Sequence, residues 1–247
     1  YTKEKNVQAL KLLYGNVPDT LSQLVRTAFI PEKGKMFVDA DFSAIEARVV
    51  AWLAGETWVL DVFRTHGKIY EAAASQMFGV SIDLIKKGNP EYALRQKGKV
   101  ATLALGYGGG PPALINMGAL KMGIPEEELP DIVSKWRASN KAIVRCWKAL
   151  ESAAIEALET GRPIGTRCLV FAREADINTN QDFLTITLPS GRKLFYAKPH
   201  LCTNKWGNKS IGYYGMNQTT KKWTNLETYG GKLTENVVQA IARDCLA

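Results

Sequence analysis

The spacing of apolar residues changes near Gly161. Before this glycine, apolar residues recur at helical spacing from about residue 44 to residue 160. After it, residues 168–171 have the composition of a strand, and residues 183–196 alternate on either side of a Pro-Ser-Gly-Arg turn, which predicts a hairpin. Helices gathered in one part of a chain and strands in another indicate an α+β fold. We therefore expect an α+β protein that is mostly helical.

The remaining segments carry weaker signals. Short helices are expected before residue 29 and a turn at 31–35, because Asn, Pro and Gly interrupt the helical pattern there. A short apolar strand is expected next, and a loop rich in Gly, Asn and Lys precedes the last helix. The expected segments are helical pieces in 6–28 broken at 16–19, a strand at 36–42, helix breaks at 78–79, 88–90 and 106–112, a loop at 205–223 and a final helix at 235–247.

Composition narrows the classes of function. The 247-residue chain has a net charge of +8, and a basic protein attracts polyanions such as nucleic acid. No apolar stretch approaches the roughly 20 residues that span a bilayer, so no membrane partner is expected. The four cysteines are widely scattered, which fits a reducing, cytoplasmic setting. With only two histidines, a metal site would have to use carboxylates, which favours a hard ion such as Mg²⁺.

Two acids lie where the predicted strand at 36–42 gives way to a helix. Asp39 and Asp41 are two residues apart and would share one side of a strand. Two buried carboxylates repel each other, and a divalent cation would relieve that cost. The alternative is a polar strand end at which Lys or water satisfies both acids.

The next acid, Glu46, has a structural interpretation. Ser43-Ala44-Ile45-Glu46 fits a capping box, in which Ser43 caps the helix and Glu46 returns a hydrogen bond. Arg48 could neutralise a nearby acid or be exposed.

A second set of candidate residues lies on a predicted helix. Arg95, Lys99 and Leu103 are four residues apart and share one face, whereas Lys97 is on another. Like charges at this spacing disfavour a helix, but a bridging anion such as a triphosphate would stabilise them. A solvated basic face is the alternative. Tyr107 follows within a glycine-rich stretch that ends the helix and would let a nucleic-acid backbone come close.

These residues resemble two motifs of family A DNA polymerases, and the resemblance is closest to the bacteriophage and prophage members. Asp41-Phe-Ser-Ala-Ile-Glu-Ala-Arg48 resembles motif A, and Arg95-x-x-x-Lys99 followed by Leu-Gly-Tyr-Gly resembles motif B. The resemblance implies template-directed addition of dNTP to a primer 3′-hydroxyl by two-metal phosphoryl transfer. It also implies primer–template DNA and dNTP as partners, and the cytoplasm of a bacterial host as the setting. The helices and sheet would be the fingers and part of the palm.

The resemblance also implies roles for individual residues. Asp41, with the backbone carbonyl of Phe42, would hold two Mg²⁺ ions. Arg95 and Lys99 would grip the triphosphate, and Lys99 could protonate the leaving pyrophosphate. Glu46 would exclude a ribose 2′-hydroxyl. Tyr107 would help to position the template and the nascent pair. This chain departs from the family at two nucleotide-site positions: Leu103 stands where the family usually has an aromatic that stacks on a base, and Tyr70 stands where many members have a His that contacts the triphosphate.

The resemblance further implies that the chain is a fragment. Residues 1–52 would be partial palm with motif A, 53–160 fingers, and 161–247 the rest of the palm, truncated before the His-Asp-Glu of motif C. By the same comparison with the family, we expect no thumb or exonuclease segment within this chain ahead of the partial palm. The hairpin and thumb would come in cis or in trans. We expect this fragment to be nearly inactive alone, and to expose a sheet edge that could promote self-association.

Two other functions fit parts of this sequence. A non-catalytic nucleic-acid-binding module would keep the cationic helix and tolerate loss of Asp41. A single-subunit RNA polymerase shares these motifs, but an acid at position 46 would block the 2′-hydroxyl that it must accept. The basic, aromatic segment 205–223 suits nucleic acid and equally suits a packed β-loop.

Overall fold

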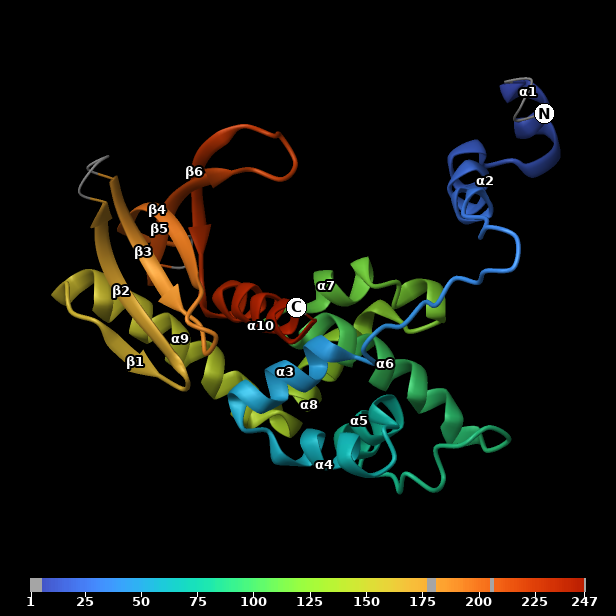
Figure 1. Cartoon of the computed structure of the whole chain (residues 1–247). Helices are drawn as coiled ribbons and strands as arrows, with labels where there is room; N and C mark the ends of the chain where they lie inside the picture. Colours follow the sequence, from blue (N-terminus) through green and yellow to red (C-terminus); the bar gives the residue numbers. More distant parts are fainter. Residues whose placement is uncertain (1–5, 177–180, 205–206, 247) are drawn as a thin grey trace. The chain divides into compact units, whose positions relative to one another are not determined.

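The computed structural model describes residues 6–176, 181–204 and 207–246. Its internal contacts divide the chain into two compact units, one ending at Ser43 and one beginning at Ala44. Figure 1 shows the elements of both units.

The first unit contains short helices, as the sequence predicts. They are α1 (Val7–Tyr14), α2 (Val17–Leu24) and the 3₁₀ helix η1 (Val25–Ala28). The predicted break at 16–19 is confirmed only at Asn16, because α2 begins at Val17 and includes Pro18 and Asp19. The Asn16 side chain accepts from the Asp19 amide and caps the helix, with Pro18 in its first turn. The turn at 31–35 is also present, with Lys35 N–H donating to the Glu32 carbonyl at 2.9 Å.

The strand predicted at residues 36–42 is wrong. This segment has no regular secondary structure, and no described strand pairs with it. A strand exists only where a neighbouring strand takes up its backbone hydrogen bonds, so apolar, β-favouring residues are not sufficient. Met36 and Val38 are accordingly 82% and 86% exposed. The alignment of Asp39 and Asp41 that was argued from strand geometry has no basis in the structure.

The second unit begins with helices, which confirms the predicted helical region and its breaks. Gly79 ends α5 and Gly161 ends α9 in the left-handed conformation, at φ 68° and 67°, which glycine adopts without strain. The helices are α3 (Ile45–Ala54), α4 (Thr57–Thr65), α5 (Ile69–Phe78), η2 (Pro90–Ala93), α6 (Leu94–Leu105), α7 (Pro111–Asn116), η3 (Leu120–Met122), η4 (Glu126–Glu128), α8 (Leu129–Ser139), α9 (Lys141–Thr160) and α10 (Gly230–Leu246).

A six-stranded antiparallel sheet follows α9, with its strands in sequence order. The predicted hairpin is β3–β4, with Leu184 opposite Tyr196. Both side chains are buried in the core that α9 shares with the sheet. Figure 1 shows α9 lying along the sheet. The α+β, mostly helical class is therefore confirmed. The strands are β1 (Ile164–Thr166), β2 (Leu169–Asp176), β3 (Gln181–Thr187), β4 (Lys193–Thr203), β5 (Lys209–Met216) and β6 (Trp223–Thr228).

The expected loop at 205–223 is corrected, because residues 209–216 within it form the strand β5. Its glycines indicated a loop, but Gly212 has a packing reason. A Cβ at this position would lie 2.3 Å from the His200 ring, so only glycine fits beneath the histidine. Residues 205 and 206 lie outside the described part of the chain.

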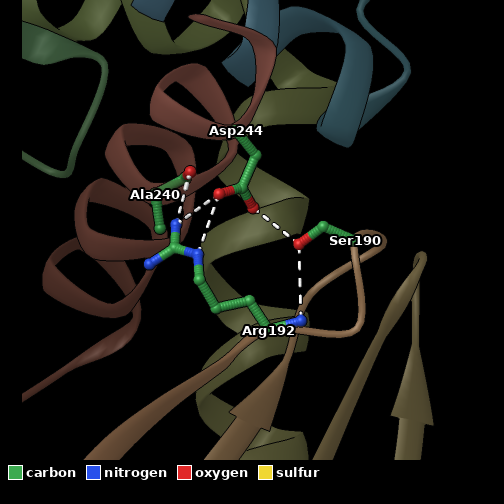
Figure 2. Close-up of polar contacts among 4 residues, drawn as sticks. All are labelled: Ser190, Arg192, Ala240 and Asp244. Carbon is green, nitrogen blue, oxygen red and sulfur yellow. Dashed lines mark hydrogen bonds and ion pairs between the residues drawn. The ribbon is translucent and has the colours of Figure 1, made fainter. Parts of the chain in front are cut away.

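The helix α10 packs against α9 and α3 and completes the core. Figure 2 shows how its C-terminal end is fastened to the β3–β4 turn. The Arg192 side chain donates to Asp244 and to the Ala240 carbonyl, each at 2.8 Å, and Ser190 donates to Asp244 at 2.7 Å. These bonds hold the Asp244 pKa below its usual range, with the Ser190 hydrogen bond as the main cause.

Among the described residues, no helix is both long enough and apolar enough to cross a membrane.

Candidate functional site

The helix α6 carries the cations that the sequence analysis singled out. Its four-residue spacing places Arg95, Lys99 and Leu103 along one face, and Leu103 is 47% exposed. Lys97 points elsewhere, as expected, and forms an ion pair with Glu128. The face that bears Arg95 and Lys99 is therefore separate from the face that packs toward α8.

Arg95 is held in place by α5. Its Nε–H donates to Glu71 at 2.7 Å, and its guanidinium lies over the Tyr70 ring, 5.4 Å from the centroid. The Glu71 hydrogen bond is the main reason why the Arg95 pKa is raised. Only one of the five guanidinium N–H donors is used in this bond. The resemblance placed Tyr70 at the triphosphate. In the structure Tyr70 lies beside Arg95, the cation that is predicted to bind the triphosphate.

A glycine brings α5 and α6 together. Gly98 is buried, and a Cβ on it would lie 2.2 Å from the Tyr70 carbonyl oxygen and 2.9 Å from the Ala74 nitrogen. Any side chain here would separate the two helices and pull Arg95 away from Glu71. The sequence analysis missed Gly98, and a glycine inside a helix next to a functional lysine is the signal that could have found it.

The capping box predicted for Ser43 and Glu46 is wrong. Ala44 is the N-cap of α3, in the left-handed conformation at φ 52°, and no side chain makes a cap hydrogen bond. Glu46 instead accepts a 2.9 Å hydrogen bond from the Tyr107 hydroxyl, 61 residues away. Tertiary structure has thus joined two of the predicted site residues.

Tyr107 is held as a neutral donor. Burial, followed by the negative charge and hydrogen bond of Glu46, raises its pKa far above the ordinary value. Leu103 lies one helical turn before Tyr107 in the sequence. Arg95, Lys99, Leu103 and Tyr107 therefore follow one another at the spacing of successive turns.

The glycine-rich turn after α6 is packed against the protein itself. A Cβ on Gly231 would lie 2.2 Å from the Tyr107 carbonyl oxygen, so the first turn of α10 sits directly against this residue. Trp147 Nε1–H donates to the Gly106 carbonyl at 2.9 Å, and Arg137 donates to that of Gly109 at 3.1 Å. We expected a nucleic-acid backbone to come close to Tyr107. In the structure the first turn of α10 lies against this residue instead. The Gly230-Gly231 pair, which sequence reasoning missed, makes this contact possible.

The predicted metal ligands belong to the first unit. Asp41 and Phe42 lie in its irregular C-terminal segment, and Phe42 is 48% exposed. The structure therefore brings together Glu46, Tyr107 and the residues of α5 and α6, all within the second unit.

A helix face with Arg and Lys one turn apart, followed by a tyrosine held by a hydrogen bond, offers donors that suit a polyanion. Comparisons with known proteins name the family of this chain. The family model for DNA polymerase family A matches residues 3–181. The chain therefore belongs to DNA polymerase family A.

Three relatives that are similar to this chain are named as DNA polymerases. The chain is 56% identical over 247 residues to a DNA polymerase of Bacillus phage SP02, covering 99% of this chain and 37% of that protein. It is 32% identical over 140 residues to the thermostable DNA polymerase I of Thermus aquaticus, covering 55% of this chain and 16% of that protein. A Thermus thermophilus polymerase of the same name is 31% identical over 160 residues, covering 64% and 17%. The chain thus spans little more than a third of the phage relative.

Family A DNA polymerases are generally metal-dependent, and the sequence analysis predicts Asp41 as a ligand. Carboxylate and backbone carbonyl oxygens are the donors that Mg²⁺ prefers, so the ligand type fits. Within residues 6–176, 181–204 and 207–246, however, no three His, Cys, Asp or Glu side chains gather closely enough to hold a metal ion. The described residues therefore fit the ion in chemistry but do not form a complete site.

Proposed function

We propose that this chain is the nucleotide-selecting part of a DNA polymerase that adds dNTP to a primer under the direction of a template. The observation that carries the proposal is the α6 face on which Arg95 and Lys99 stand one turn apart, ahead of the Tyr107–Glu46 hydrogen bond. Membership of family A supports the same reaction.

Each side chain has a task in this proposal. Arg95, oriented by Glu71, and Lys99 bind the triphosphate, because a guanidinium fork and an ammonium match its oxygens. Lys99 also donates a proton to the departing pyrophosphate oxygen. Glu46 fills the space that a ribose 2′-hydroxyl would need, and the Tyr107 hydroxyl fixes that carboxylate. Leu103 and Tyr70 line the same face beside the nucleotide.

The metal ligands in this proposal are Asp41 and the Phe42 carbonyl. Mg²⁺ ions, two in the family mechanism, activate the attacking oxygen and steady the leaving one when bound. Asp41 supplies one carboxylate, and we propose that other ligands come from segments of the longer protein, of which this chain matches 37% in the phage relative. We therefore expect little turnover from the 247-residue chain alone.

The domain assignment is part of the same proposal. Residues 53–160 would be fingers, and 1–52 with 161–247 would be palm, working with a thumb in cis or in trans on primer–template DNA in the host cytoplasm. The outer edge of β6 is open for pairing in the six-stranded sheet, which supports self-association of the isolated chain.

The test is single-nucleotide primer extension with Mg²⁺. It compares the 247-residue chain with a chimaera in which this chain replaces the matching segment of the SP02 polymerase. Each is also made as Asp41→Asn, with Asp39→Asn as the matched control. We expect the chimaera to extend a primer, Asp39→Asn to retain activity and Asp41→Asn to abolish it. If no form extends a primer yet all bind DNA, a non-catalytic nucleic-acid-binding module replaces this proposal.

A further inference from the structure

The antiparallel register places a line of residues on the face of the sheet away from α9. Phe183 of β3 is opposite Ala197 of β4, Ala197 is opposite Tyr214 of β5, and Tyr214 is opposite Asn225 of β6. Successive residues of a strand point to opposite faces. The alternate row, which contains Leu184, is buried in the core beside α9. The row from Phe183 to Asn225 therefore lies on the face away from α9.

Each of the four strands from β3 to β6 contributes an aromatic side chain to this open face. Phe195, two residues before Ala197, packs edge-to-face on Phe183 with ring centroids 5.7 Å apart. Trp223 is two residues before Asn225 and therefore points the same way. Phe195, Tyr214 and Trp223 are 60%, 38% and 59% exposed. Large aromatic rings exposed on neighbouring strands are costly in water unless something covers them.

Cations accompany these rings. Lys198, at φ 49°, places its ammonium 5.7 Å from the centroid of the Tyr214 ring. Lys221 and Lys222 are exposed in the β5–β6 turn, where Lys221 N–H donates to the Asn217 carbonyl at 2.8 Å. Lys193 is also on this face, paired with Glu174 at 2.7 Å.

The turn that carries two of these lysines is held in one conformation. Besides its backbone bond to Lys221, Asn217 accepts from the backbone amides of Thr219 and Thr220 at 2.9 Å each. The two lysines are therefore presented by an ordered turn beside the aromatic row.

We propose that this open face binds single-stranded nucleic acid, with bases stacked on Phe195, Tyr214 and Trp223 and phosphates near Lys198 and the β5–β6 turn. A four-stranded sheet whose aromatics stack successive bases is an established way to bind single strands. A duplex is a poor fit, since its base faces are already stacked. A protein partner is disfavoured because lysine is depleted in protein interfaces. None of these residues belongs to the nucleotide site, so the inference does not rest on the proposed function.

The test is fluorescence anisotropy of a labelled 12-nucleotide oligo(dT) titrated with the 247-residue chain. Trp223→Ala and Tyr214→Ala are compared with Trp52→Ala, which removes a tryptophan of α3 that is 50% exposed. We expect each sheet variant to weaken binding about fivefold to a hundredfold, because base stacking contributes that much per aromatic. Trp52→Ala should bind as the unaltered chain does. Lys198→Gln should also lower the dependence of binding on salt concentration.

A labelled duplex of the same length shows whether the face is specific for single strands. We expect Trp223→Ala to leave duplex binding unchanged, with an unaltered thermal unfolding transition as the check on folding. The inference is overturned if the sheet variants bind oligo(dT) normally, if Trp52→Ala weakens binding as much, or if duplex binding falls in parallel. Because Asp41→Asn should retain oligo(dT) binding, loss of polymerase activity and loss of this site are distinguishable.

Discussion

The hydroxyl of Tyr107 donates to the carboxylate of Glu46 at 2.9 Å, which ties the turn after α6 to the first turn of α3. Because Tyr107 is partly buried beside the Glu46 carboxylate and its pKa is raised, it remains a donor across the ordinary pH range. The position of the Glu46 carboxylate is thus set by a residue 61 positions away.

Tyr107→Phe should weaken discrimination against ribonucleotides. The variant keeps the ring but frees the Glu46 carboxylate, and a hydrogen bond to a charged group contributes about 1.5–3 kcal/mol. In the active chimaera we expect the preference for dNTP over rNTP, measured as the ratio of kcat/KM values, to fall about tenfold or more. Glu46→Ala should reduce it further. Tyr229→Phe, at a tyrosine that is 50% exposed, is the control. An unchanged ratio in both Tyr107→Phe and Glu46→Ala would contradict the assignment.

Lys99→Gln should impair nucleotide use, whereas Lys97→Gln should not. Both changes remove one positive charge from α6, but Lys97 is paired with Glu128 on another face. Loss of a charge-assisted hydrogen bond to the triphosphate predicts a decrease in kcat/KM for dNTP of about tenfold to a hundredfold for Lys99→Gln. Steady-state primer extension by the chimaera measures both variants. Equal losses would mean that only the net charge of α6 matters.

Gly98→Ala should destabilise the fold. The added methyl group would meet backbone atoms of α5, the nearest of them 2.2 Å away, and overpacking of this kind costs about 1–3 kcal/mol. Gly106→Ala is the matched control, because Gly106 has φ −57° and nothing lies within 4 Å of its added Cβ. Its effect should stay within about 0.5 kcal/mol. Urea unfolding of the 247-residue chain measures both free energies, and similar values would show that α5 and α6 can separate without cost.

The hydrogen bonds that Asp244 accepts from Ser190 and Arg192 should make the free energy of unfolding depend on pH in the acid range. The Asp244 pKa is lowered in the folded state, so the unfolded chain binds more protons at low pH. The stabilisation is therefore complete above the ordinary aspartate pKa of about 4 and is lost as the pH falls below it. Asp244→Asn should lower the free energy of unfolding at pH 7, and the difference should shrink toward pH 3. Ser190→Ala, which removes the main cause of the shift, should show the same trend more weakly. A difference that is constant with pH would refute the linkage.

Local sequence determined much of this protein. The helical region from α3 to α9 and its breaks near residues 79, 89 and 106–112 follow apolar spacing and Gly and Pro stops, and the β3–β4 hairpin follows alternation around a turn. The Arg95–Lys99 face was also predictable, because residues four apart on one helix always share a side. These features depend on residues that are neighbours along the chain.

Tertiary structure decided the rest. Residues 36–42 have β-favouring side chains but form no strand, because strand formation requires a hydrogen-bonding neighbour. Glu46 matched a local capping pattern, yet its carboxylate found the distant Tyr107 hydroxyl. Gly98 and Gly212 resembled helix and strand breakers, but each fits where another segment packs against the backbone. Such contacts join groups that are far apart in the sequence. Periodicity and local motifs do not indicate which distant group will contact a given residue.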